Sequence, residues 1–179
     1  MDTKALRQKI LDLAIRGKLV PQDPNDEPAS VLLERIRAEK QQMVKDGKLK
    51  PKDIKNDTVI FKGDDNLHYE KFSGGTVKCI EDEIPFDVPN NWEWCRFGSY
   101  TLNRDSERKP VSSVQRKKVK KIYDYYGASG VIDQTDSFLF DEELLLIGED
   151  GANLLARTKP IAFLADGKYW VNNHAHCID

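Results

Sequence analysis

The sequence has no long hydrophobic run. Its longest unbroken apolar segment is residues 161–165, whereas a membrane-spanning helix needs about 20 apolar residues. Residues 1–17 carry charges throughout, where a secretory signal peptide has an apolar centre. We therefore expect neither a membrane span nor a secretory leader, and we predict a soluble protein of the cytoplasm.

Cysteine is also scarce. The three cysteines, Cys79, Cys95 and Cys177, are odd in number and far apart in the chain. This pattern fits reduced thiols in a reducing compartment better than a disulfide framework or a Cys-x-x-Cys metal site.

Glycine motifs for nucleotides are missing. The chain has no Gly-x-x-x-x-Gly-Lys-Ser/Thr loop, and residues 127–130 and 148–151 lack the spacing of a dinucleotide or S-adenosylmethionine loop. No Asp/Asn-Pro-Pro-Tyr run is present to receive a target amino group. An ATP-driven motor and an autonomous methyltransferase are therefore disfavoured, and we expect no cofactor on this chain.

Patterns for metal chemistry are weak. His174 and His176 would share one face of a strand, but no third ligand is identifiable, so we predict no metal site. Asp150, followed by Asp166 and Lys168, imitates the arrangement by which many nucleases hold Mg²⁺. An autonomous Mg²⁺-dependent nuclease therefore stays open as an alternative function.

Charge is segregated along the chain. The 28 Lys and Arg nearly balance the 30 Asp and Glu, which excludes a uniformly basic nucleic-acid coat. Residues 104–121 nevertheless hold eight basic residues against two acidic ones, and residues 133–150 hold seven acidic residues and no Lys or Arg. One surface can therefore attract phosphate groups although the whole chain is almost neutral.

Two amphipathic helices are predicted at the start of the chain, over residues 3–16 and 28–46. Their apolar residues recur at helical spacing, and a glycine follows each predicted helix. These helices hold too few large apolar residues for a core of their own, so we expect a docking arm. The residues expected to dock on a partner are Leu6, Ile10, Leu13, Leu32, Leu33 and Ile36.

From residue 58 onward the hydrophobic period shifts toward two, which predicts short strands. Together with the helices, this indicates an α+β fold with an N-terminal helical arm and a β-rich body. The predicted strands cover residues 59–61, 67–72, 76–80, 92–97, 117–126, 138–140, 144–147, 161–165 and 168–171.

Six ordered blocks of the sequence resemble the DNA-specificity (S) subunit of type I restriction-modification enzymes. They are LRQKILDLAIRGKLVPQDPNDEPASVLLERIRAEK (6–40), VIFKGDDNLHYEK (59–71), VKCIEDEIPFDVPNNWEWCRFG (77–98), YYGASGVID (125–133), LLIGEDGANL (145–154) and WVNNHAHCI (170–178). Six blocks in order are far more specific than any single pattern above.

The resemblance implies a non-catalytic DNA-binding subunit. In that family, two target-recognition domains each read one half of a split site, and helices between them hold methyltransferase (M) subunits. Restriction (R) subunits complete the nuclease, so S-adenosylmethionine, ATP and Mg²⁺ are expected on the partner subunits. Residues 1–50 would be helical spacer and residues 51–179 a target-recognition domain, resembling a DNA methylase specificity domain and expected to be incomplete at Asp179.

Two further expectations accompany the resemblance. A homodimer of half-subunits would provide two recognition domains for one bipartite target on double-stranded DNA. An assembly fragment that does not bind DNA stays open as a further alternative.

A recognition domain needs cations for phosphates and polar groups for base edges. For phosphate contact we predict Arg116, Lys117, Lys118, Lys120 and Lys121. For base reading the candidates are Tyr125, Tyr126, Ser129, Asn153, Arg157, Asn172, Asn173 and His174. The tyrosines could instead belong to the core, and Asn172 with Asn173 could form a turn.

Overall fold

Two helices open the chain in the computed structural model, which describes residues 2–179. They are α1 (Thr3–Ile15) and α2 (Ala29–Lys45), within one residue of the predicted bounds at each end. The Asp2 carboxylate caps α1 by accepting hydrogen bonds from the backbone N–H groups of Lys4 and Ala5. Gly17, with φ of +64°, follows the helix in the left-handed conformation that glycine favours.

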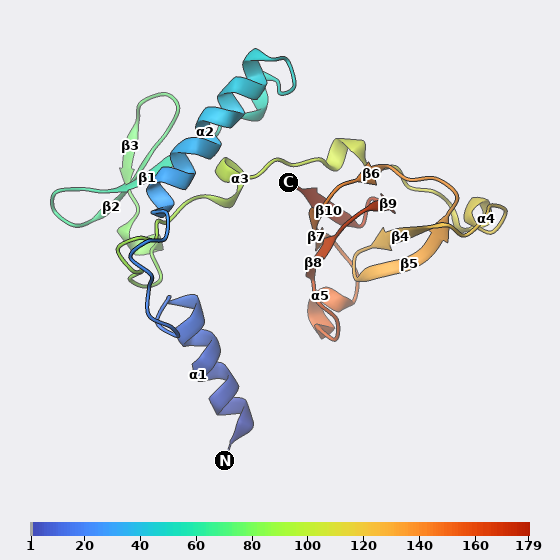
Figure 1. Ribbon diagram of the computed structural model, residues 1–179, viewed down its shortest axis with the longest axis horizontal. Coiled ribbons are helices and arrows are strands. Elements are labelled where there is room, and N and C mark those ends of the chain that lie inside the picture. The colour runs from blue at the N-terminus through green and yellow to red at the C-terminus, as the bar shows by residue number, and fades with distance from the viewer. Residues whose placement is uncertain (1) are drawn as a thin grey trace. The chain divides into compact units, whose positions relative to one another are not determined.

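The chain divides into two compact units, Met1–Tyr100 and Thr101–Asp179 (Figure 1). The predicted boundary at residue 50 between a spacer and a recognition domain lies inside the first unit. That functional division stays a prediction, because the compact units describe packing rather than DNA contact.

A small antiparallel sheet accompanies α2 in the first unit. Its strand order is β1-β2-β3, and each pair of consecutive strands forms an antiparallel hairpin. The short helix α3 contacts α2. The elements are β1 (Val59–Lys62), β2 (His68–Lys71), β3 (Val77–Cys79), α3 (Phe97–Tyr100) and the 3₁₀ turns η1 (Pro51–Asp53) and η2 (Glu81–Glu83).

A buried polar cluster connects these elements. Lys40 is only 4% exposed. Its ammonium group lies 2.7 Å from the Asp57 carboxylate and donates a hydrogen bond to the Ser99 carbonyl at 2.9 Å. The Thr58 hydroxyl donates to Glu70 at 2.6 Å, and Glu70 is also paired with an arginine. Among the described residues of this unit, Ile80 is the one fully buried hydrophobic side chain. Polar contacts therefore organise the first unit more than an apolar core does.

The second unit contains two sheets. One is four-stranded in the order β5-β4-β9-β6, with β4 and β9 parallel, and the other is three-stranded in the order β10-β7-β8. Three short helical segments, η3 (Asp105–Glu107), α4 (Ser113–Arg116) and α5 (Asn153–Ala156), lie in its loops. The strands are β4 (Tyr123–Gly127), β5 (Gly130–Thr135), β6 (Phe140–Asp141), β7 (Leu144–Gly148), β8 (Ala162–Ala165), β9 (Lys168–Val171) and β10 (Ala175–Ile178).

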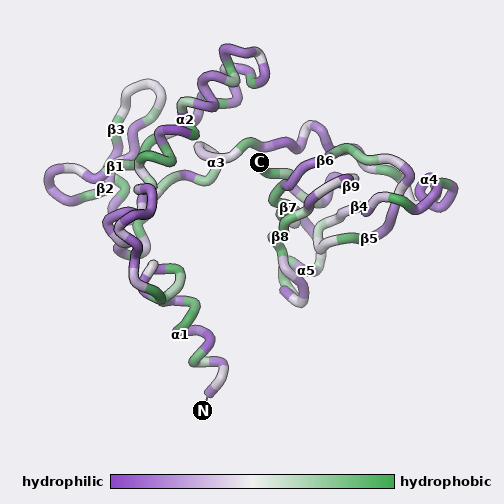
Figure 2. The backbone as a smooth tube through the Cα atoms, viewed as in Figure 1, coloured by the Kyte–Doolittle hydropathy of each residue, from purple (hydrophilic) through white to green (hydrophobic). Residues whose placement is uncertain are grey.

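An apolar core fills the second unit. Alternate residues of β7 are buried, and Figure 2 shows hydrophobic stretches along β7 and β10. The core comprises Phe140, Leu144, Leu146, Ala165, Tyr169, Val171, Ala175 and Cys177. Burial raises the pKa of the Cys177 thiol to about 12, so this cysteine is an inert packing residue.

The α+β class is confirmed, while the resemblance to a methylase specificity domain stays a prediction. Most strands lie close to their predicted positions. Two strand predictions are wrong. Residues 92–97 form no strand, because Trp94 packs on Phe86 in a proline-bounded loop and Phe97 begins α3. Residues 117–122 precede β4 as a turn and loop after α4.

No helix within residues 2–179 combines the length and the apolar character that crossing a membrane requires.

We predict that Lys40→Ala destabilises the first unit by about 3 kcal/mol, because it leaves the Asp57 carboxylate without its buried partner. Urea unfolding followed by Trp92 and Trp94 fluorescence in a Trp170→Phe background measures the change. Lys45→Ala, an exposed position on the same helix, should stay within about 0.5 kcal/mol of the parent protein. Equal losses in both variants would contradict the structural role of Lys40.

Candidate nucleic-acid interface

The basic segment, residues 116–121, begins at the last residue of α4 and is held at both ends by one carboxylate. Ser112 caps α4 by accepting a hydrogen bond from the Gln115 backbone N–H. Arg116 Nε then lies 2.7 Å from Asp133 Oδ2, and Lys121 Nζ lies 2.7 Å from Asp133 Oδ1. Asp133 belongs to β5, so the segment is attached to the edge of the four-stranded sheet.

Arg116 is a structural residue in this arrangement. Its guanidinium group donates to the Val111 carbonyl and lies 4.3 Å from the centre of the Tyr125 ring, a cation–π contact. Its side chain is 14% exposed. Most of its hydrogen-bonding capacity is therefore used inside the protein.

Three lysines between the ends of the segment are free. Lys117, Lys118 and Lys120 are exposed, and the ammonium group of none of them makes a hydrogen bond or ion pair with another residue of the described range 2–179. Val119 between them is half-buried. The segment thus presents three ammonium groups to solvent from a fixed turn, which is the chemistry that contacts phosphate.

The two paired cations lower the pKa of Asp133. Hydrogen bonds from Lys121 and Arg116, in that order, and from the Gln134 backbone N–H hold the pKa of Asp133 far below its usual range. The carboxylate is therefore charged throughout the physiological pH range and keeps both ends of the segment in place.

The two candidate tyrosines lie in the core. Tyr125 is 1% exposed, and its hydroxyl accepts a hydrogen bond from the Val111 N–H at 2.9 Å. Tyr126 is half-buried, stacked on Phe163 with 5.9 Å between ring centres, and burial raises the pKa of its hydroxyl. Both rings support the loops around them in this structure rather than offering their edges to a ligand.

Three loops meet at the C-terminal end of β4, where the β4–β5 hairpin closes. They are the β4–β5 turn with Ser129, the β9–β10 turn with Asn172, and the loop that follows β7. Asn172 N–H donates to the Tyr126 carbonyl at 3.1 Å. A Cβ atom on Gly148 would lie 2.4 Å from the Ala128 carbonyl oxygen, so only glycine permits this approach.

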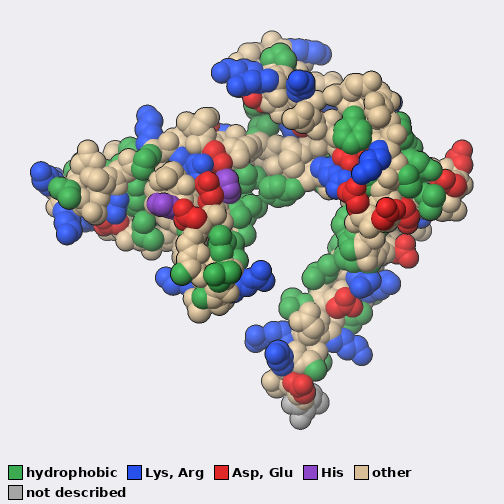
Figure 3. Space-filling model, turned by 180° about the vertical axis from the view of Figure 1, so that it is seen from behind, with side chains coloured by type: hydrophobic (Ala, Val, Ile, Leu, Met, Phe, Trp, Pro, Cys, Tyr) green, Lys and Arg blue, Asp and Glu red, His purple; other side chains and the backbone are tan. Residues whose placement is uncertain are grey.

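The β9–β10 turn confirms the interpretation of residues 172–173 as a turn. Asn172 is buried, and its side-chain oxygen accepts from the His174 N–H at 2.8 Å. Asn173 and His174 are exposed. His174 lies 2.6 Å from Asp150, and Figure 3 shows both histidine side chains of this unit beside acidic ones. Asn173 is therefore the freest polar side chain at this turn.

The side chain of Asn153 forms all of its hydrogen bonds within its own loop. Its side-chain oxygen accepts hydrogen bonds from the Thr158 N–H, the Thr158 hydroxyl and the Lys159 N–H, and its amide donates to the Lys159 carbonyl. Arg157, exposed and in the left-handed conformation with φ of +48°, lies inside this ring of bonds. The loop is thereby rigid, while the guanidinium group of Arg157 is available.

The two sets of candidates lie at opposite ends of the β4–β5 hairpin. Lys121 contacts Gln134 near the open end, whereas Ser129 lies in the closing turn. Five residues of β4 separate the two ends, a length of about 17 Å. The phosphate candidates and the base-reading candidates therefore lie in two separate regions of the second unit (Figure 1).

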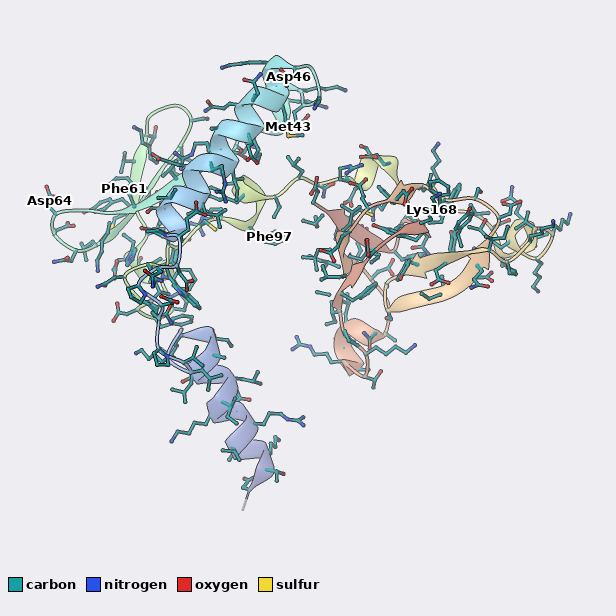
Figure 4. All side chains as sticks on the ribbon, in the orientation of Figure 1. Met43, Asp46, Phe61, Asp64, Phe97 and Lys168 are labelled. Carbon is teal, nitrogen blue, oxygen red and sulfur yellow. The ribbon has the colours of Figure 1, made fainter. Side chains whose placement is uncertain are left out.

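The residues of the nuclease alternative do not form a site. Asp166 accepts from the Gly167 N–H in a turn, and Lys168 lies over the Phe138 ring, 3.8 Å from Asp141. Figure 4 places Lys168 on β9, away from the α5 loop that follows Asp150. Within residues 2–179, no three His, Cys, Asp or Glu side chains are grouped to hold a metal ion.

Asp133→Asn should destabilise the second unit at pH 7 and release the basic segment. The lowered pKa of Asp133 means that its stabilisation is present above the unfolded-state pKa of about 3.9 and is lost as pH falls toward the folded-state value. The difference between parent and variant in urea unfolding should therefore shrink between pH 5 and pH 2. Asp136→Asn, at an exposed position, should show no such trend, and a difference independent of pH would contradict the pairing.

The chain is similar to three curated proteins. It is 42% identical over 111 residues to the type I restriction enzyme EcoEI specificity subunit of Escherichia coli, covering 62% of this chain and 15% of that protein. It is 46% identical over 95 residues to the EcoAI specificity subunit of the same organism, covering 53% and 13%. A putative type I specificity subunit of Haemophilus influenzae is 36% identical over 87 residues, covering 49% and 22%.

The matched segments thus span less than a quarter of the length of these relatives. No family model matches the chain, and no solved structure matches it significantly. The identities confirm the resemblance predicted from the six sequence blocks: this chain is similar to a segment of the specificity subunits of type I restriction enzymes.

Proposed function

We propose that this chain supplies part of the DNA sequence-recognition subunit of a type I restriction-modification system and directs methyltransferase and restriction subunits to a bipartite target. The observation that carries the proposal is the 42% identity over 111 residues to a type I specificity subunit. In this proposal the chain itself is non-catalytic and works in the cytoplasm, while S-adenosylmethionine, ATP and Mg²⁺ are used by its partners. Two copies would supply two recognition domains.

Phosphate contact is assigned to the basic segment. Lys117, Lys118 and Lys120 are exposed and free, so they can exchange counterions for phosphates. Arg116 and Lys121, which pair with Asp133, fix the shape of the segment and add to its positive potential. This division of labour gives each of the five predicted residues a physical role.

Base reading is assigned to the loops at the closing end of the hairpin. Asn173, His174 and Ser129 retain polar groups that can face a base edge, and the exposed guanidinium group of Arg157 can reach either a base or a phosphate. Of the other candidates, Tyr125, Asn153 and Asn172 use their polar groups in hydrogen bonds within the protein, and Tyr126 packs its ring on Phe163. These four residues position the loops. Base-edge contacts of this kind decide sequence preference.

Partner docking is assigned to the helices. Leu6 and Ile10 are 46% and 43% exposed, and no residue of α1 is buried. Leu32 of α2 is 39% exposed. The remaining docking candidates, Leu13, Leu33 and Ile36, are half-buried. An apolar stripe that the rest of the chain does not cover favours binding of a protein partner. We assign the methyltransferase subunit as that partner.

Replacing Lys117, Lys118 and Lys120 together with Gln should weaken DNA binding by the assembled complex and make it less salt-dependent. Each lost phosphate contact lowers the slope of log K against log salt by about 0.9, so the slope should fall by about 3. Fluorescence anisotropy with a labelled target duplex at several salt concentrations measures both effects.

The matched control replaces Lys45, Lys48 and Lys52, which are exposed lysines of the first unit, with Gln. It carries the same change of net charge and should leave the salt slope unchanged. An unchanged slope in the first variant as well would remove the basic segment from DNA binding and favour an assembly fragment.

Leu6→Asp with Ile10→Asp should abolish co-purification of the methyltransferase subunit without unfolding the chain, because both side chains are already exposed. Lys4→Asp with Gln8→Asp places two aspartates at the same spacing on the opposite side of α1 and should keep the partner, although it changes the net charge by one unit more. Retention of the partner by both variants would exclude this face of α1 from docking.

A further inference from the structure

The loop between β7 and β8 presents the most exposed large hydrophobic side chain of residues 2–179. Leu155 in α5 is 92% exposed, whereas its neighbour Leu154 is half-buried. The next most exposed, Val20 and Leu164, reach 66% and 63%. A single exposed leucine is common on protein surfaces, so a partner for Leu155 is indicated only by the loop that holds it and by the charges around it.

Hydrogen bonds close and brace the loop that carries Leu155. Gly148 N–H donates to the Ile161 carbonyl and closes the loop at its base, where β7 pairs with β8. Inside it, four hydrogen bonds join the Asn153 side chain to Thr158 and Lys159. Leu155 is therefore fixed on a preformed tip, and little conformational entropy is lost when that tip is inserted into a partner.

The surroundings of Leu155 are positive. Arg157 and Lys159 are exposed on the same loop, and residues 151–160 contain no Asp or Glu. The acids at the base of the loop are already paired, Glu149 with Arg108 and Asp150 with His174. Figure 3 shows the hydrophobic tip of this unit between Lys and Arg side chains.

We propose that Leu155 is a wedge that inserts between two base pairs of the target duplex while Arg157 and Lys159 hold the flanking phosphates. The proposal rests on the DNA-binding function proposed above and adds a mechanism of specificity to it. Apolar side chains that enter a base step unstack it and kink the duplex, at a cost that depends on the step. Leu155 would then select for a deformable step without any hydrogen bond to a base.

The test uses the methyltransferase complex of this chain and a duplex bearing the sequence that the complex methylates, with 2-aminopurine at one position at a time. When the parent complex binds, the fluorescence of 2-aminopurine should rise at a single base step, because the base is unstacked there. Leu155→Ala should abolish that signal and weaken binding about tenfold, with the salt slope unchanged. Arg157→Ala with Lys159→Ala should instead lower the slope by about 2.

Leu164→Ala is the matched control, since Leu164 is an exposed leucine of the same unit, on β8. It should behave like the parent protein. The proposal would be overturned if Leu155→Ala kept the fluorescence signal and the affinity of the parent protein. It would also be overturned if no 2-aminopurine position gained fluorescence in the parent complex. Loss of the methyltransferase subunit from Leu155→Ala would also overturn it by making Leu155 a protein contact. Failure of the parent complex to bind any duplex would refute the proposed function itself.

Discussion

The Asp133 carboxylate is the group on which the proposed phosphate-binding surface depends. One oxygen pairs with Arg116 and the other with Lys121, so the chain between them is held as a short turn on the sheet edge. Three lysines in one turn repel each other, and without the carboxylate their positions would spread. The ion pairs contribute local order more than overall stability, because part of each pair is in contact with water. That local order places the lysines next to a rigid hairpin.

The two units are stabilised in different ways. The second unit has an apolar core, from which its loops project as fixed points. The first has Ile80 and a polar cluster around Lys40, with much of its apolar surface on α1 still exposed. A unit built in this way gains stability from a partner that covers the helix. The proposed docking role and the proposed recognition role therefore rest on two different distributions of hydrophobic residues.

The sequence predicted the elements whose pattern is local. The helices follow from their apolar spacing, and β9 coincides with its prediction because Tyr169, Trp170 and Val171 all favour strands. Residues 92–97 alternate as well, yet Trp94 packs on Phe86 within a loop, a tertiary contact that the local pattern does not encode. The Ser112-x-x-Gln115 capping box was a readable signal for α4 that the strand prediction overlooked. The exposure of Leu155 had no signal in the sequence, because it depends on the bonds that Asn153 makes across its loop.

We propose that the second unit chooses the DNA sequence. Exchanging Thr101–Asp179 for the corresponding segment of a related specificity subunit, followed by sequencing of the methylated genome, tests this most directly. The account predicts that one half of the bipartite methylated site changes to that of the donor while the other half stays the same. Efficient methylation at an unchanged site would contradict it.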